Sequence, residues 1–331
     1  MNYAIETSGL KKRYGDHWAL KGIDLAVKPG SVYGLLGPNG AGKTTTVGIL
    51  TTLLKPDDGE ARVMGFDVRS QAAEVRSRIS LTGQYASVDE DLTGLENLIL
   101  IGRLYGFSWK AARARARELL EAFDLTSSAL KLVRTFSGGM RRRLDVAAGL
   151  VVHSDVIFLD EPTTGLDPRS RNQVWEIVRA IAEQGATVLL TTQYMEEADR
   201  LAHRLAVIDH GRVIAEGTGR DLKARVGANS LHIRLYSASD TKKAAAVLKH
   251  EKLVVHPGSD AFSLVATIDE DHKISKVFHA LSAKGLRMAE FAVSQPSMDE
   301  VFFALTGHPA EGEAGEAKTG DTGEVVAGRI E

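Results

Sequence analysis

Residues 37–44 read GPNGAGKT, and this octapeptide constrains the fold more than any other stretch of the chain. It fits the phosphate-loop pattern G-x-x-x-x-G-K-[ST], with Gly37, Gly42, Lys43 and Thr44 in the fixed places. A short apolar run suited to a buried strand precedes it, and apolar residues at helical spacing follow it. The loop amides and the positive end of the following helix dipole would face an anion. The segment therefore predicts a nucleotide site in which Lys43 reaches the β- and γ-phosphates and Thr44 holds Mg²⁺.

A second informative segment, DVIFLDEP (155–162), is an apolar run that ends in two carboxylates. An apolar strand of this kind lies inside a parallel sheet, and its carboxyl end is where α/β sheets bind ligands. Asp160 is suited to Mg²⁺, and Glu161 is then free to polarise a water molecule. Strand and helix patterns alternate across residues 30–218, which predicts an α/β fold with a mostly parallel sheet.

Two further residues admit two interpretations each. Tyr14 lies between two expected strands, residues 3–9 and 20–28, where an aromatic ring stacks on a purine or simply packs half-buried. Gln84 follows the strand expected within residues 77–87, where its amide coordinates Mg²⁺ or is merely exposed to solvent.

The segment TFSGGMRRRLDVAAGLVV (135–152) places Ser137, Gly138 and Gly139 directly before a helical pattern. A serine cap followed by glycines leaves free amides at a helix N-terminus, which predicts a second anion site or an ordinary helix start. The adjacent Arg141–Arg143 are expected to be surface charges on the first turn.

Composition limits the function classes. The chain has 331 residues, a net charge of −2 and no cysteine, so it has room for two domains and no disulfide or thiolate metal site. The charge gives no overall attraction to nucleic acid or acidic lipid. The most apolar stretch, residues 95–106, is shorter than the ~20 residues needed to span a bilayer. The N-terminal residues lack the apolar core of a secretory signal. Any membrane role is therefore expected to come through a partner.

The pattern changes at about residue 219. After a linker at 221–229, residues 230–307 follow the order strand-helix-strand-strand-helix-strand of a small ferredoxin-like α+β domain. Ser297 and Glu300 predict a capping box for a closing helix. Dimer bracing, regulation and plain packing all remain open as roles for this domain. Residues 308–331 are rich in Gly and Glu and are expected to form a disordered acidic tail.

Taken in order, these motifs resemble those of one family, the ATP-binding subunits of ABC transporters. GPNGAGKT resembles the Walker A loop, Gln84 the Q-loop, FSGGM (136–140) the ABC signature, VIFLDE (156–161) Walker B, GLD (165–167) the D-loop and Tyr14 the adenine-stacking aromatic. Walker A also occurs in kinases and GTPases, whereas the Ser-Gly-Gly signature shortly before Walker B singles out ABC proteins. The resemblance implies an ABC-type P-loop NTPase core over residues 1–220, with antiparallel β and helical subdomains, the latter at about 88–135.

More narrowly, TGQYASVDEDLTGLENL, GLDPRSRNQVW, LLTTQYMEEAD and DEVFFALTGHPA resemble daunorubicin/doxorubicin-resistance type ATPases. Those are subunits of antibiotic exporters that work with a separate membrane protein. The switch position, usually His in the wider family, is Gln193 here, as in this subgroup. Gln donates a hydrogen bond to the γ-phosphate but cannot become cationic, so little rate dependence on a group titrating near pH 6.5 is expected.

The resemblance also implies roles for particular residues. Glu161, Lys43, Gln84 and Gln193 would act in hydrolysis, and Thr44, Gln84 and Asp160 would hold Mg²⁺. The implied contacts to ATP are Tyr14, Gly37, Pro38, Asn39, Gly40, Ala41, Gly42, Lys43, Thr44, Thr45, Ser137, Gly138, Gly139 and Asp167.

One Walker A and one signature per chain imply a homodimer with ATP between the two copies, where Ser137 and Gly139 of one copy touch the γ-phosphate bound by the other. The dimer would sit at the cytoplasmic face of the cell membrane, peripheral through a multi-span permease. Two alternatives stay open: a soluble ABC ATPase acting on the ribosome or DNA, and a module that sequesters the drug. The sequence lacks the second nucleotide domain of translation-type members and the coiled coils or zinc sites of DNA-repair types, which argues against the first alternative. An aromatic content of 6% argues against the second.

Overall fold

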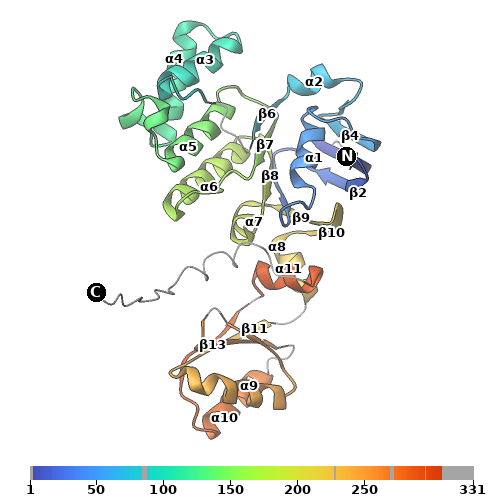
Figure 1. Cartoon of the computed structure of the whole chain (residues 1–331), viewed down its shortest axis with the longest axis vertical. Coiled ribbons are helices and arrows are strands. Elements are labelled where there is room, and N and C mark those ends of the chain that lie inside the picture. The colour runs from blue at the N-terminus through green and yellow to red at the C-terminus, as the bar shows by residue number, and fades with distance from the viewer. Residues whose placement is uncertain are drawn as a thin grey trace, which may run out of the picture. The chain divides into compact units, whose positions relative to one another are not determined.

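The computed structural model describes residues 3–83, 88–226, 229–258, 260–268, 272–294 and 296–307. These residues divide into two compact units, with the boundary between Ile214 and Ala215 (Figure 1). None of the helices in the described part of the chain has the length and apolar character that crossing a membrane requires.

The first unit is built on a six-stranded sheet with the order β10-β9-β3-β8-β7-β6. Its strands are β3 (Val32–Leu36), β6 (Ile79–Thr82), β7 (Val156–Asp160), β8 (Thr187–Thr192), β9 (Arg204–Asp209) and β10 (Arg212–Gly217). β3 pairs in parallel with β8 and β9, and β7 pairs in parallel with β6 and β8. The mostly parallel sheet expected from the alternation of strands and helices is therefore confirmed, and the ends of β3, β7 and β8 meet at one edge.

A second, antiparallel sheet of order β2-β1-β4-β5 covers one face of the first. It comprises β1 (Ile5–Tyr14), β2 (His17–Val27), β4 (Asp58–Val63) and β5 (Phe66–Asp67), and α2 (Ala72–Arg76) follows it. The helix α1 (Lys43–Leu50) packs in the same core as both sheets. This core includes Val47 of α1, Ile23 of β2, Phe158 of β7 and Leu189 of β8. This core fixes the phosphate loop between β3 and α1.

The other face of the six-stranded sheet is covered by a helical layer. Its members are α3 (Gly94–Leu104), α4 (Trp109–Ala122), α5 (Gly138–Gly149) and α6 (Pro168–Glu183), and α7 (Met195–Leu201) follows β8. Ile157, Leu159, Val188 and Leu190 point into this second core, whereas the residues between them in β7 and β8 point into the first. This alternation is the two-residue period of strands buried on both faces.

The second unit contains α8 (Gly219–Val226), β11 (Asn229–Leu235), α9 (Thr241–His250), β12 (Val254–Pro257), β13 (Ser263–Ile268), α10 (His272–Ala283), β14 (Met288–Ser294) and α11 (Met298–Thr306). Its sheet order, β12-β13-β11-β14, is antiparallel throughout and confirms the ferredoxin-like topology. The capping box of Ser297 and Glu300 is also confirmed.

Residues 221–226, expected to belong to a linker, instead form most of α8. Thr218 and Asp221 exchange hydrogen bonds between side chain and backbone at the start of this helix, and Leu222 is buried. The linker assignment missed this capping signal. The expected tail, residues 308–331, lies outside the described residues.

Candidate active site

The phosphate loop folds around the ammonium group of Lys43. Lys43 Nζ donates hydrogen bonds to the carbonyl oxygens of Gly37 (2.8 Å) and Pro38 (3.0 Å), and the side chain is 4% exposed. A Cβ at Gly37 would lie 2.2 Å from the carbonyl oxygen of Ile208, and Gly42 has a φ of +109°. Only glycine satisfies both positions, so the fixed glycines of the sequence pattern are explained by close packing and backbone conformation.

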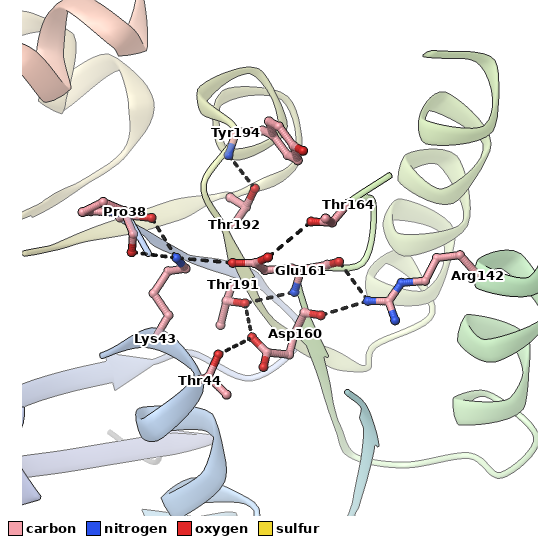
Figure 2. Close-up of polar contacts among 11 residues, drawn as sticks. Pro38, Lys43, Thr44, Arg142, Asp160, Glu161, Thr164, Thr191, Thr192 and Tyr194 are labelled. Atoms are coloured by element: carbon pink, nitrogen blue, oxygen red, sulfur yellow. Dashed lines mark hydrogen bonds and ion pairs between the residues drawn. The ribbon is translucent and has the colours of Figure 1, made fainter. Parts of the chain in front are cut away.

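Two carboxylates at the end of β7 face this loop (Figure 2). Thr44 Oγ1 donates to Asp160 Oδ1 at 3.3 Å, and Thr191 on the neighbouring strand donates to the same oxygen. Glu161 Oε1 lies 3.4 Å from Lys43 Nζ. The structure thus brings Lys43, Thr44, Asp160 and Glu161 together, as the sequence predicts.

Glu161 has a backbone conformation that is unusual for a residue with a side chain. Its φ is +50°, and its N–H donates to both the carbonyl oxygen (3.2 Å) and the Oγ1 (3.0 Å) of Thr191. Its Oε2 accepts from Thr164 Oγ1 at 3.3 Å. A positive φ of this kind costs about 1–3 kcal/mol and persists only where neighbouring groups hold it, as Thr191 does here.

A hollow of about 300 Å³ opens beside these groups. It is lined by Tyr14, His17, Ala19, Asn39, Gly40, Gly42, Lys43, Thr44, Thr45 and Glu161. Tyr14 is the last residue of β1, rather than part of a loop, and is 48% exposed. The volume is at the lower end of the range of ligand pockets. The aromatic ring, the loop and Glu161 therefore share one solvent-accessible depression.

The serine-glycine motif forms a separate group. Ser137 caps α5, where its Oγ accepts from the N–H of Met140 at 3.2 Å, and its side chain is exposed. Asp167 caps α6 and accepts from the N–H and the Oγ of Ser170, bonds that lower the pKa of its carboxyl. A Cβ at Gly139 would lie 3.7 Å from Asp167 Oδ2, so the two caps are neighbours. None of these residues, nor Gly138, lines the hollow beside Lys43.

The remaining two predicted residues follow the ends of β6 and β8. Gln193 comes directly after β8, and the next residue, Tyr194, donates its N–H to Thr192 Oγ1 at 2.9 Å. Gln84 lies outside the described residues, one position after Gly83.

The expectation that Arg141–Arg143 are surface charges is wrong for Arg142 and Arg143, whose side chains are 12% exposed. Arg142 donates five hydrogen bonds to backbone carbonyls and to Asp145. Burial lowers the pKa of Arg142, and nearby carboxylates, Asp145 first among them, counteract this. A run of three arginines in the first turns of a helix gives no local signal for such burial.

Sequence reasoning also missed Glu197 on α7, which is fully buried. Its Oε1 accepts from Thr163 Oγ1 (2.8 Å) and from Trp175 Nε1 (3.0 Å). Burial raises the pKa of this carboxyl above its ordinary value. The residue joins the segment after β8 to the segment after β7 and to α6.

Comparisons with known proteins give the family to which the chain belongs. Residues 20–164 match the family described as ABC transporter, and residues 217–306 match the family described as ATP-binding protein DrrA1-3-like, C-terminal domain. The chain is 57% identical over 309 residues to the daunorubicin/doxorubicin resistance ATP-binding protein DrrA of Streptomyces peucetius, covering 93% of this chain and 94% of that protein. It is 40% identical over 307 residues to the Nod factor export ATP-binding protein I of Burkholderia orbicola, covering 92% and 97%.

Solved structures give the same assignment. The structure of an ATP-binding subunit of an ABC transporter matches with a TM-score of 0.62 and 27% identity, covering 68% of this chain and 93% of that one. A dimeric, post-hydrolysis ATP-binding cassette bound to ADP and Pi matches with a TM-score of 0.60 and 26% identity, covering 65% and 98%.

The chain therefore belongs to the ATP-binding proteins of ABC transporters and is an ATP-hydrolysing enzyme. Within that family it falls in the daunorubicin/doxorubicin-resistance type. Proteins of this family bind ATP with a divalent metal, and their cassettes work as dimers with a separate membrane subunit.

Proposed function

We propose that this chain powers the efflux of a drug or antibiotic-like compound through a separate membrane permease, at the cytoplasmic face of the membrane. The observation that carries the proposal is the convergence of Lys43, Thr44, Asp160 and Glu161 beside one hollow, in a chain 57% identical to a daunorubicin/doxorubicin resistance ATP-binding protein. The class of cargo is taken from the names of such relatives.

The residues present suit Mg²⁺, a hard cation that prefers oxygen ligands. The hydroxyl of Thr44 and the carboxylate of Asp160, 3.3 Å apart, would hold it, with Gln84 as a third ligand. Bound there, the ion would neutralise charge on the β- and γ-phosphates. Lys43 would bind the same phosphates through its ammonium group, and Gln193 would donate a hydrogen bond to the γ-phosphate.

The carboxylate of Glu161 polarises the attacking water in this proposal. Its position 3.4 Å from Lys43 Nζ keeps it beside the phosphate end of the hollow. Thr191 holds the backbone of Glu161 in the positive-φ conformation that goes with this side-chain position. Positioning and charge stabilisation of this kind are what phosphoryl transfer requires of a protein.

Ser137 and Gly139 would complete the site of a second copy. Both lie at the start of α5, where Ser137 is exposed and Gly139 partly exposed, and neither lines the hollow of its own chain. Free amides and a helix dipole at such a cap favour a phosphate. We therefore propose a homodimer in which ATP lies between the phosphate loop of one copy and the Ser137 cap of the other.

The variant Glu161→Gln tests this mechanism. Because the amide cannot act as a base, hydrolysis should fall by at least about 100-fold while ATP still binds. Unhydrolysed ATP should then hold two copies together as a dimer in gel filtration with Mg-ATP. The matched control, Glu161→Gln combined with Lys43→Ala, should stay monomeric. A single Glu161→Gln variant that hydrolyses ATP at the wild-type rate would contradict the role of Glu161.

The transport role has its own test. The chain, purified from membranes of its native cells, should co-purify with a multi-span membrane protein, and deletion of either gene should sensitise the cells to the same compound. Co-sedimentation with ribosomes in place of the membrane fraction would favour the soluble alternative.

A further inference from the structure

We propose that Arg142 is a positioning residue that couples α5, the helix capped by Ser137, to the carboxylate of Glu161 in the same chain. The proposal rests on the role given above to Glu161. It concerns a residue that contacts neither nucleotide nor water in that mechanism and acts through the backbone of the catalytic strand.

The guanidinium group of Arg142 holds three consecutive carbonyl groups at the end of β7. Nη2 donates to the carbonyl oxygens of Asp160 (2.9 Å) and Glu161 (2.8 Å), and Nε donates to that of Pro162 (3.1 Å) (Figure 2 shows Arg142 beside Asp160 and Glu161). A guanidinium is planar and presents its donors in a rigid fork, so these bonds fix the orientation of the peptide groups as well as their position.

These bonds act on the strained residue itself. Glu161 has a φ of +50°, its N–H is held by Thr191 on one side, and its carbonyl oxygen is held by Arg142 on the other. A strained backbone keeps its conformation only while its surroundings determine it. Thr164 also donates its N–H to the carbonyl oxygen of Glu161, but at a longer distance, 3.3 Å. Loss of Arg142 therefore removes the shorter bond to this carbonyl group, and the position of the Glu161 side chain beside Lys43 becomes less well fixed.

The other edge of the guanidinium ties this contact to α5 and β6. Nη1 donates to Asp145 Oδ2 (3.1 Å), one turn further along the same helix, and to the carbonyl oxygen of Gly83 (2.7 Å). Asp145 is 1% exposed, and it balances the charge of Arg142 in a site where an unpaired ion would be costly. Because both ends of the fork are occupied, Arg142 cannot reorient independently of α5. A displacement of α5 therefore shifts the carbonyl groups of the catalytic strand.

Arg143 provides a matched control, since it is adjacent and equally buried. Its Nη1 donates to the carbonyl oxygen of Phe123 and to Gln173 Oε1, both at 3.0 Å, so these bonds tie α5 to other parts of the helical layer. Loss of either arginine removes buried hydrogen bonds, but only loss of Arg142 removes a bond to the Glu161 peptide.

The experiment compares Arg142→Gln, Arg142→Lys and Arg143→Gln in the full-length chain. Three quantities are measured: the Kd for a fluorescent ATP analogue, the single-turnover rate of Mg-ATP hydrolysis, and the urea midpoint from tryptophan fluorescence. Arg142→Gln should leave the Kd within about twofold and lower the rate by at least about tenfold, a difference equal to about 1.4 kcal/mol of barrier. Arg142→Lys should restore little of the rate, because an ammonium group lacks the rigid planar fork of donors that binds these three carbonyl groups. Arg143→Gln should lower the urea midpoint similarly and keep the rate within about threefold.

A double variant separates positioning from general damage. In the Glu161→Gln background, Arg142→Gln should produce no further loss of the residual rate, because the two residues act as one unit. If Glu161→Gln hydrolyses ATP normally, the proposed catalytic role fails before Arg142 is considered. If Glu161→Gln is inactive but Arg142→Gln turns over at the wild-type rate, or if both arginine variants lose rate in proportion to stability, the positioning role alone is overturned. Should Arg142→Gln fail to fold, Arg142→Lys carries the same comparison.

Discussion

Tyr14 is the residue through which the base of ATP would be held. It lines the hollow beside the phosphate loop and is 48% exposed, so its ring contributes little to the core. Stacking of a base on an aromatic ring is worth about 1–3 kcal/mol, so Tyr14→Ala should raise the Kd for ATP by at least about fivefold. Tyr14→Trp, which keeps a stacking surface, should bind as the wild type does. Titration with a fluorescent ATP analogue measures both, and an unchanged Kd in Tyr14→Ala would show that the ring packs without stacking.

The buried carboxyl of Glu197 should make the stability of the chain depend on pH. Because burial raises the pKa of its carboxyl in the folded state, the folded chain holds this proton more tightly than the unfolded chain does. The free energy of unfolding should therefore decrease as the pH rises from the ordinary value of 4.5 through the raised value. Glu197→Gln should remove this decrease, since an amide does not titrate and its oxygen still accepts from Thr163 and Trp175.

Urea unfolding at about pH 5 and pH 8 measures the effect. The chain has three tryptophans, Trp18, Trp109 and Trp175, and all three lie in the first unit, so their fluorescence reports its unfolding. The exposed carboxyl of Asp167 has a lowered pKa and acts only below its ordinary value of 3.8, outside this window. If the free energy of unfolding changes equally with pH in the wild type and in Glu197→Gln, Glu197 is not the source of the pH dependence.

Whether the role of a residue could be predicted from the sequence depended on how far away in the sequence its hydrogen-bond partners lie. Lys43 could be assigned because the carbonyl groups that hold it, those of Gly37 and Pro38, belong to its own motif. The carbonyl groups that bury Arg142 lie 18 to 59 residues away, so no pattern within α5 distinguishes it from a surface arginine. Glu197 is similar, because its partners come from two other segments.

The N-cap of α5 allows the effect of a substitution on stability to be separated from its effect on hydrolysis. Aspartate caps helices about as well as serine does, so Ser137→Asp should leave the urea midpoint nearly unchanged. The added negative charge would face the γ-phosphate in the proposed dimer, so hydrolysis should be lost. Ser108→Asp at the start of α4 is the matched control, since Ser108 caps its helix in the same way and should tolerate the change without loss of rate. Equal activity in both variants would place the Ser137 cap away from nucleotide.

Elements with their own local signals were predicted well. The strand before the phosphate loop, the strand ending in Asp160 and the order of elements in the second unit were all confirmed. β4 and β5 are separate strands rather than one continuous strand, because Met64 and Gly65 both adopt a positive φ and turn the chain. A glycine preceded by methionine gave too weak a signal for that turn.

The proposed dimer can be tested by mixing two inactive variants of the chain. If ATP lies between two copies, a mixture of Lys43→Ala and Ser137→Asp chains contains dimers with one intact site, formed by the phosphate loop of the second variant and the serine cap of the first. Each variant alone should be inactive, and mixing should restore a fraction of the wild-type ATPase rate. A mixture as inactive as its components would indicate that each chain uses its own serine cap.

The packing of β7 determines how a movement of one layer is transmitted to the other. Val156 and Phe158 are embedded in the layer that carries the phosphate loop, while Ile157 and Leu159 are embedded in the layer that carries α5. Successive side chains of this strand thus pack in two different layers. The strand cannot shift toward one layer without loosening its packing against the other layer. Close-packed interiors change between discrete arrangements rather than deforming continuously. A movement of the helical layer would therefore reach the carboxylates at the tip of this strand as an abrupt change.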